Sequence, residues 1–136
     1  ANPNSGGAYG GRQSSWSWLL GNQSITSTHT YYCTDMPTNT FGYALAGLTS
    51  ANINMPAGAL GRLCVVGAGR YVNQVRNSGT TGRIFTTISP MSIPQPTGFV
   101  SGSVGQTWYF QYWHRDIASG AASSNFSTAC RMQFTN

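Results

Sequence analysis

The sequence contains no lysine and no glutamate, and its only acidic residues are Asp35 and Asp116 in 136 positions. Acid–base catalysis by paired carboxylates needs two acids in one cleft, so the scarcity of acids argues against this chemistry. Solubility must come from Ser, Thr, Asn, Gln and Gly, because charged residues make up only 7% of the chain. This composition favours an extracellular or densely packed setting, and we expect a secreted protein.

Long apolar runs and basic clusters are also missing. No stretch of about 18 apolar residues occurs, so no membrane span is expected. The net charge of +5 comes entirely from arginine. A nucleic-acid surface requires basic residues gathered on one face or element, and here they stand singly. The seven arginines are Arg12, Arg62, Arg70, Arg76, Arg83, Arg115 and Arg131. We therefore predict no nucleic-acid partner.

Metal-binding and catalytic signatures are absent as well. The two histidines and three cysteines are too widely spaced to match a metal-binding motif. A Ser-His-Asp triad is compositionally possible with His29 or His114, but no nucleophile elbow accompanies either residue. We interpret His29 as a strand surface residue and His114 as a polar position beside a packed tryptophan. The sequence thus predicts no enzyme, no metal site and no cofactor.

The sequence does contain a residue pattern that is typical of β-strands. Thr, Val, Ile and aromatic residues alternate between clusters of Gly, Pro, Ser and Asn, and helix formers are scarce. This pattern predicts an all-β fold, a single antiparallel β-sandwich of about seven to nine short strands. The expected strands are residues 16–20, 25–34, 41–45, 60–66, 83–89, 107–115 and 128–134, with a proline-punctuated connection after the fifth.

Two regions follow from this pattern. Residues 14–136 form the predicted sandwich domain, and residues 1–13 form a glycine-rich N-terminal segment. We expect this segment to contact a neighbouring subunit or to lie across the domain's own sheet.

The strand expected at 107–115 carries large rings on both faces. Alternation puts Trp108, Phe110 and Tyr112 on one side and Tyr109 and Trp113 on the other. One side is expected to fill the core; the other is covered by a loop or partner, or presents a sugar-stacking or assembly surface. A tryptophan pair near the N-terminus poses the same choice. The candidate assembly or ligand contacts are Trp16, Trp18, Tyr109 and Trp113.

Several segments, in this order along the chain, resemble a family of uncharacterised bacterial secreted domains. They are NTFGY at 39–43, GRLC at 61–64, GRY at 69–71, PTGFV at 96–100, GQTWYFQYWHRD at 105–116 and SNF at 124–126. The fifth is close to the family hallmark G-E-T-W-N-F-Q-A-W-Y-R-D, and the opening ANPNSGG is also similar. The resemblance covers nearly the whole chain and implies export and a β-rich module, but no activity, ligand or catalytic residue.

The departures from the family concern cysteine and tryptophan. Family members commonly have a cysteine just before the opening motif, and the resemblance implies that it would be the partner of the cysteine corresponding to Cys64. Cys33 and Cys130 stand where small or aliphatic residues are expected, and both are in phase with inward strand faces. We predict a Cys33–Cys130 disulfide, with Cys33–Cys64 as the alternative pairing. Cys64 would then be a buried free thiol or, if exposed, would form a disulfide bond between subunits.

These observations favour a non-enzymatic, self-assembling subunit of an extracellular filament or surface layer. The chain has few charged residues that could repel neighbouring copies. Strand addition at an open sheet edge is the expected way for copies to join. The expected partner is a second copy of the chain. The alternative is a secreted carbohydrate-binding or adhesive module, based on the tryptophan and tyrosine content, with glycans as partners. An enzyme or a nucleic-acid coat protein is a third, less supported possibility.

Overall fold

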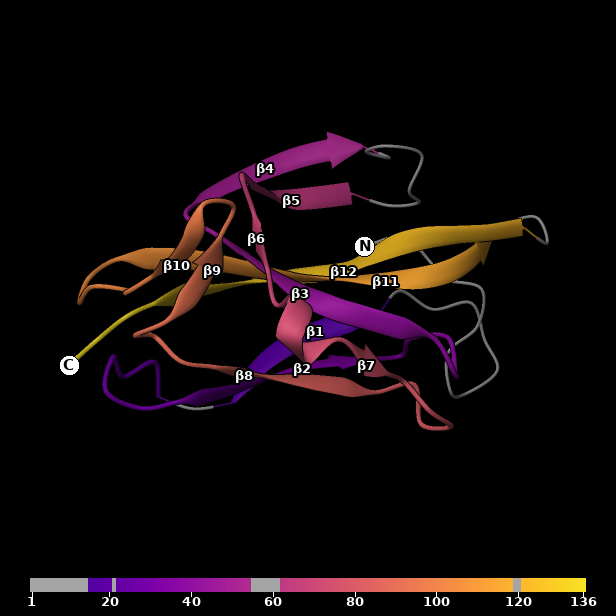
Figure 1. The fold of residues 1–136 in the computed structure, drawn as a ribbon, viewed down its shortest axis with the longest axis horizontal. Helices are drawn as coiled ribbons and strands as arrows, with labels where there is room; N and C mark the ends of the chain where they lie inside the picture. Colours follow the sequence, from indigo (N-terminus) through magenta and orange to yellow (C-terminus); the bar gives the residue numbers. More distant parts are fainter. Residues whose placement is uncertain (1–14, 21, 55–61, 119–120) are drawn as a thin grey trace.

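The computed structural model describes residues 15–20, 22–54, 62–118 and 121–136. Within these ranges the chain is all-β, with antiparallel sheets packed face to face and no α-helix, which confirms the predicted sandwich. The glycine-rich segment 1–13 lies outside the described residues. Figure 1 shows three levels: β1, β2 and β8 on one side, β3, β11 and β12 in the middle, and the β4–β5 hairpin on the other side.

The first sheet has the order β1-β2-β8. It consists of β1 (Trp16–Leu20), β2 (His29–Thr34) and β8 (Ile84–Ile88). Strict alternation in β8 buries Ile84, Thr86 and Ile88 and leaves Phe85 and Thr87 exposed. Because side chains alternate along every strand, one face of this sheet joins the core and the other faces solvent.

The second sheet has the order β12-β11-β3-β6, with β7 also pairing β3. Its strands are β3 (Phe41–Gly47), β6 (Gly69–Arg70), β7 (Arg76–Asn77), β11 (Thr107–Ala118) and β12 (Ala121–Gln133). The long β11–β12 hairpin makes up most of this sheet. Strand β3 pairs with the other side of β11.

Two smaller hairpins complete the fold. One pairs β4 (Thr49–Asn54) with β5 (Arg62–Val66), and the other pairs β9 (Ile93–Gln95) with β10 (Gly98–Val100). A short 3-10 turn, η2 (Val72–Gln74), links β6 to β7. Strands β4, β6, β7, β9 and β10 were not predicted, so the described residues hold twelve strands instead of seven to nine.

The core lies between the two sheets and is dominated by rings from β11. Trp108, Phe110 and Tyr112 are all fully buried there, as the alternation predicted. The ring of Tyr31 on β2 stacks on Tyr112 at 4.6 Å between centroids. The Tyr112 hydroxyl donates to the Tyr31 carbonyl at 2.6 Å and lies 2.6 Å from the Thr86 hydroxyl. This hydrogen-bonded tyrosine therefore fixes one sheet against the other as well as filling space.

A bulge in β12 lets this strand contribute side chains to both faces of the second sheet. Its register against β11 shifts between the pairs Gln111–Ala129 and Trp113–Phe126. The Ser127 hydroxyl accepts from the Tyr112 amide at 2.9 Å at this point. An extra residue reverses the side-chain phase beyond it. Phe126 consequently packs with Leu45 in a second cluster, apart from the main core.

The sandwich is closed along the edge where β1 meets β12. The Ser17 amide donates to the Thr128 hydroxyl at 2.9 Å, and the Ser17 hydroxyl donates to the Thr128 carbonyl. The Thr128 amide in turn donates to the Ser15 carbonyl at 3.1 Å. These contacts occupy polar groups that a strand at the edge of a sheet would otherwise expose.

Candidate functional site

The solvent-facing side of the first sheet carries a row of rings that crosses all three strands. Trp18 lies opposite Tyr32, and Tyr32 lies opposite Phe85. The rings of Trp18 and Tyr32 stack with centroids 4.4 Å apart, and Tyr32 and Phe85 lie 6.4 Å apart in a tilted arrangement. With their neighbours Trp16 and Leu20 on β1, these residues form a surface that we call the aromatic ladder.

The aromatic ladder is open to solvent and rimmed by arginine. Trp16 is 58% exposed, and Leu20, Phe85 and Trp18 are exposed as well. The Arg76 guanidinium carbon lies 4.2 Å from the centre of the Phe85 ring, and that of Arg83 lies 5.8 Å from the Tyr32 ring. The two tryptophans proposed from the sequence thus lie on one apolar surface with cation–π contacts at its rim.

The edge of this sheet at β8 is occupied by side chains. Gln74 receives a hydrogen bond from the Thr87 amide at 2.8 Å and donates to the Thr87 carbonyl at 2.9 Å. The Arg76 side chain donates to the Phe85 carbonyl at 2.7 Å. These contacts resemble the bonds of a further strand. Strand addition, the joint expected from the sequence, would have to displace them here.

The outer face of the second sheet is covered by the β4–β5 hairpin. Gln111, which is buried on β11, forms two hydrogen bonds to this hairpin and a third to β12. Its side chain accepts from the Cys64 amide at 2.9 Å and donates to the Arg62 and Ser127 carbonyls at 2.8 Å each. Gly47 on β3 provides the space, because a Cβ there would collide with Val65. The hairpin therefore docks through one amide side chain and one glycine.

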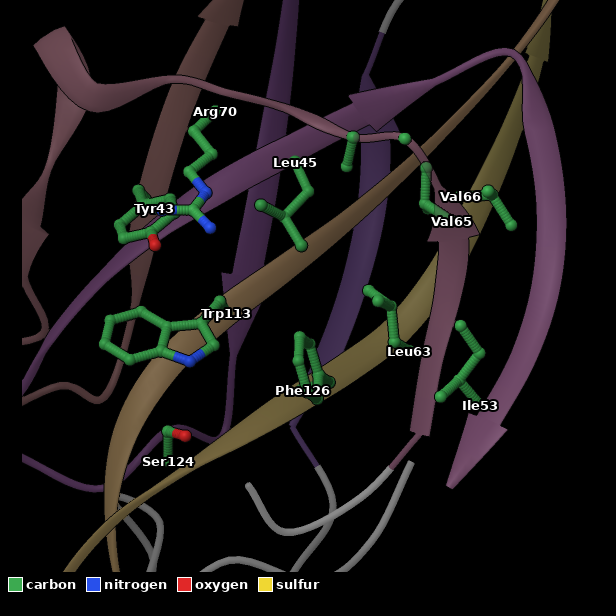
Figure 2. A pocket seen from close by; sticks show the side chains of 12 residues that line it. Tyr43, Leu45, Ile53, Leu63, Val65, Val66, Arg70, Trp113, Ser124 and Phe126 are labelled. Carbon is green, nitrogen blue, oxygen red and sulfur yellow. The ribbon is translucent and has the colours of Figure 1, made fainter. Parts of the chain in front are cut away.

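Beside this hairpin lies a cavity of about 350 Å³, which we call the hairpin pocket (Figure 2). Trp113 and Tyr43 form one wall, with ring centroids 5.0 Å apart. Residues from β3, β4, β5, β6, β11, β12 and the turn between β5 and β6 line it: Tyr43, Leu45, Ile53, Leu63, Val65, Val66, Gly67, Ala68, Arg70, Trp113, Ser124 and Phe126.

The polar groups of the hairpin pocket gather along one wall. Figure 2 shows the Arg70 guanidinium beside Tyr43, with Trp113 below them and Ser124 further along the same side. Leu45, Leu63 and Phe126 lie opposite. Arg115 adds a second cation near this wall, since its guanidinium carbon lies 5.3 Å from the Trp113 ring. The pocket thus combines an apolar side with a polar, positively charged side.

The sequence nominated Trp113 but missed the rest of this pocket. Tyr109, nominated with it, is half-buried on the same sheet opposite Gly47 and is not part of the pocket lining. Tyr43 and Arg70 come from other strands, and only the pairing of β3 with β11 and β6 brings them together. No local sequence signal marks them as neighbours.

The interior holds a serine–histidine pair. The Ser15 hydroxyl lies 2.9 Å from His114 Nε2, and His114 Nδ1 lies 2.9 Å from the Arg115 carbonyl. Burial lowers the pKa of His114, so the neutral ring is favoured. A neutral ring that donates from Nδ1 to the Arg115 carbonyl accepts a hydrogen bond from the Ser15 hydroxyl at Nε2. Asp116, on the same face of β11, accepts from the Asn125 amide group at 3.1 Å. Ser15 and His114 are both fully buried, which points to a structural role.

His29 is a correction to the sequence interpretation. It was expected on a strand surface, but it is 2% exposed and points into the sandwich. Its Nε2 lies 2.8 Å from the Ser24 carbonyl, in the turn before β2. The alternation of β2 explains this position, because His29 shares the inward phase of Tyr31 and Cys33.

The cysteines provide the second correction. Cys33, Cys64 and Cys130 are all free thiols, so the predicted Cys33–Cys130 disulfide is not formed. Ser17 explains the difference: it lies opposite Cys33 in the register and 3.5 Å from the Cys130 sulfur. The Cys130 thiol donates to the Ser17 carbonyl at 3.1 Å. The inward orientation of Cys33 was predicted correctly, and burial raises the pKa of Cys33 and Cys130.

Within the described ranges, no group of three or more His, Cys or acidic residues is placed to hold a metal ion. No helix in the described part of the chain is long and apolar enough to cross a bilayer. Comparison with protein-family models and with curated proteins returns no match. The resemblance to bacterial secreted domains therefore stays a prediction, and functional conclusions rest on the geometry.

Proposed function

We propose that this chain is a non-enzymatic, secreted structural protein that assembles with copies of itself, as in a filament or surface layer. The aromatic ladder carries the proposal. Exposed apolar patches of this kind mark contact surfaces on soluble proteins. Trp16, Trp18 and Leu20 stand on the solvent side of β1, although the inward positions of the same strand hold Ser17 and Leu19.

A second copy of the chain is the occupant that fits this surface best. Protein interfaces are rich in aromatic residues and arginine and poor in lysine and acids, which is the composition of the aromatic ladder and its rim. A symmetric contact would place rings of one copy against rings and guanidinium groups of the other. The chain has few acids to offer, because one of its two aspartates, Asp116, is buried. We therefore expect association through rings instead of ion pairs.

This mechanism predicts an unusual salt dependence. Two copies with net charge +5 repel each other, and added salt screens that repulsion. Self-association should therefore strengthen as salt rises, whereas an assembly held by ion pairs would weaken.

The test is sedimentation and negative-stain microscopy of the full chain and two variants. The double variant Trp16→Ser, Trp18→Ser should remove assembly while circular dichroism remains that of the folded protein. Phe99→Ser is the matched control, because Phe99 is 64% exposed on the separate β9–β10 hairpin. Assembly that survives the double variant, or that Phe99→Ser abolishes equally, would place the joint elsewhere.

The glycan-binding alternative has one supporting observation. Sugars stack on open ring faces, and Trp16 is the most exposed tryptophan of the aromatic ladder. Trp18 offers less, because its ring is stacked on Tyr32. Quenching of tryptophan fluorescence by an oligosaccharide, lost in Trp16→Ser alone, would favour this alternative over self-assembly.

The non-enzymatic part of the proposal is supported by burial. Among the described residues, Ser15 and His114 come closest to a catalytic pair, yet both are fully buried, where a substrate would not reach them. Their bond links the start of β1 to β11 and has a structural explanation.

A further inference from the structure

We propose that the hairpin pocket binds a small amphipathic carboxylate, a molecule with one carboxylate group on an aromatic or branched aliphatic body. The cavity of about 350 Å³ is in the size range of small-molecule sites. Such sites combine a largely apolar lining with a few polar groups that orient the ligand. The hairpin pocket has both features, on opposite sides (Figure 2).

The polar side of the pocket offers mainly hydrogen-bond donors. The guanidinium of Arg70 and the indole nitrogen of Trp113 can only donate, and the hydroxyls of Tyr43 and Ser124 can donate or accept. None of these four side-chain groups has a hydrogen-bond partner among the described residues. A ligand that satisfies them must bring acceptor atoms.

The charge on this side selects a carboxylate. A guanidinium pairs with a carboxylate through two parallel hydrogen bonds, an arrangement that is both strong and directional. Arg70 forms no ion pair within the described part of the chain, so this geometry is available to a ligand. Arg115, seated against Trp113, adds positive potential next to the same site.

The apolar side selects the rest of the molecule. Leu45 and Phe126 are each 5% exposed and pack with Leu63 beside the cavity. A sugar placed here would turn hydroxyl groups toward these side chains, where they would lose hydrogen bonds to water and gain none. An aromatic ring or a branched alkyl group loses nothing on entry. The pocket therefore favours an aryl or alkyl carboxylate over a glycan.

The hairpin pocket and the aromatic ladder belong to outer faces of different sheets, so this inference does not depend on the assembly proposal. It adds a ligand to a protein proposed as structural. Either proposal can fail without affecting the other, since the variants that test them share no residue.

The probe is 3-phenylpropionate, with the neutral 3-phenylpropionamide as its control, titrated into the nitrogen-15-labelled full chain. Each tryptophan gives one indole N–H resonance, and Trp113→Phe identifies the one in the pocket. We expect the carboxylate to shift the Trp113 resonance saturably and to leave that of the core residue Trp108 unchanged. The amide should bind at least about tenfold more weakly, because it lacks the charge-assisted bonds.

Two arginine variants sharpen the test. Arg70→Gln should weaken binding of the carboxylate by about tenfold or more and leave binding of the amide unchanged. Arg131→Gln removes another exposed charge, from β12 outside the pocket lining, and it should have no effect. A Trp113 resonance that does not move at millimolar carboxylate overturns the proposal. So does equal binding of acid and amide, binding that Arg70→Gln leaves intact, or tighter binding of a monosaccharide than of the probe.

Discussion

The two outer faces of this molecule carry the same kinds of residue and differ in what lies over them. On the first sheet, the aromatic ladder is open to solvent with arginines at its rim, and Trp16 is more than half exposed. On the second sheet, Trp113 and Tyr43 are half-buried beside a docked hairpin. The comparison shows that a covering hairpin turns an aromatic sheet face into a pocket, whereas a bare face of similar composition is suited to contact with another molecule.

The difference originates in a few residues. Gln111 on the covered face supplies an amide that binds the backbone of β5, and Gly47 leaves room for Val65. The corresponding outward positions on the bare face are Tyr32 and Thr87, and the Thr87 backbone is already bonded to Gln74. A hairpin placed over the first sheet would find no equivalent attachment among these residues.

The largest effect should come from removing the attachment itself. Gln111→Leu leaves the Cys64 amide and the Arg62 and Ser127 carbonyls without their partner. Buried polar groups left unpaired cost about 1–3 kcal/mol each, so we expect a loss of about 2–4 kcal/mol in the free energy of unfolding. Urea denaturation measures this loss. A change within error would mean that apolar packing alone holds the hairpin.

A matched pair of substitutions compares the faces directly. Trp113→Ala should lower the free energy of unfolding by about 2–3 kcal/mol, because a half-buried ring that packs against Tyr43 and the Leu45–Phe126 cluster is removed. Trp18→Ala should cost about 1 kcal/mol, the size of an exposed aromatic pair. Equal losses in urea denaturation would show that the aromatic ladder is part of the stabilising core.

Acid should lower the stability of the folded protein through a histidine in the interior. The pKa of His114 in the folded protein is lowered from 6.5 by burial, so below that pH the unfolded chain binds a proton that the folded chain does not. Stability is therefore full above about pH 6.5 and falls as the pH drops from there toward the folded pKa. His114→Gln should flatten this slope in denaturation curves measured across this range. An unchanged slope would assign the acid sensitivity to other groups.

The smallest effect on stability, but a clear difference in rate, is expected for the thiols. Alkylation requires the thiolate, and burial raises the pKa of Cys33 and Cys130. Cys64 on the hairpin is half-exposed. Mass spectrometry after iodoacetamide treatment should find Cys64 modified first and Cys33 only on unfolding. Modification of Cys33 as fast as Cys64 would require an opening of the core.

The sequence predicted those parts of the fold in which alternation is strong. The strand at 84–88 and the rings of 108–112 lie where period-two patterning placed them, because each has a clear apolar face. Strand β4 was missed because Ala51, Asn52 and Asn54 have weak β-propensity. Strand β9 was missed because Pro94 was taken as a breaker, although it lies in a short hairpin.

The site was predictable only in part. Trp16 and Trp18 could be placed on one face by counting along a single strand, whereas their exposure could not. The hairpin pocket depends on Arg70, Tyr43 and Trp113 coming together from three strands. It depends also on a bulge in β12 that turns Phe126 outward. Such features follow from strand pairing, and no local window of sequence contains them.

The closed edge of the sandwich has a consequence for the order of folding. Ser17 and Thr128 are 111 positions apart, and the Thr135 amide bonds to the Gln23 carbonyl while its carbonyl accepts from Ile25. The contacts at this edge of β1 can therefore form only after β12 has been synthesised. Contacts between such distant positions slow folding, since the intervening chain must lose its freedom first. A chain emerging from a ribosome would therefore complete this edge of the sandwich only after residues 128–135 had been released.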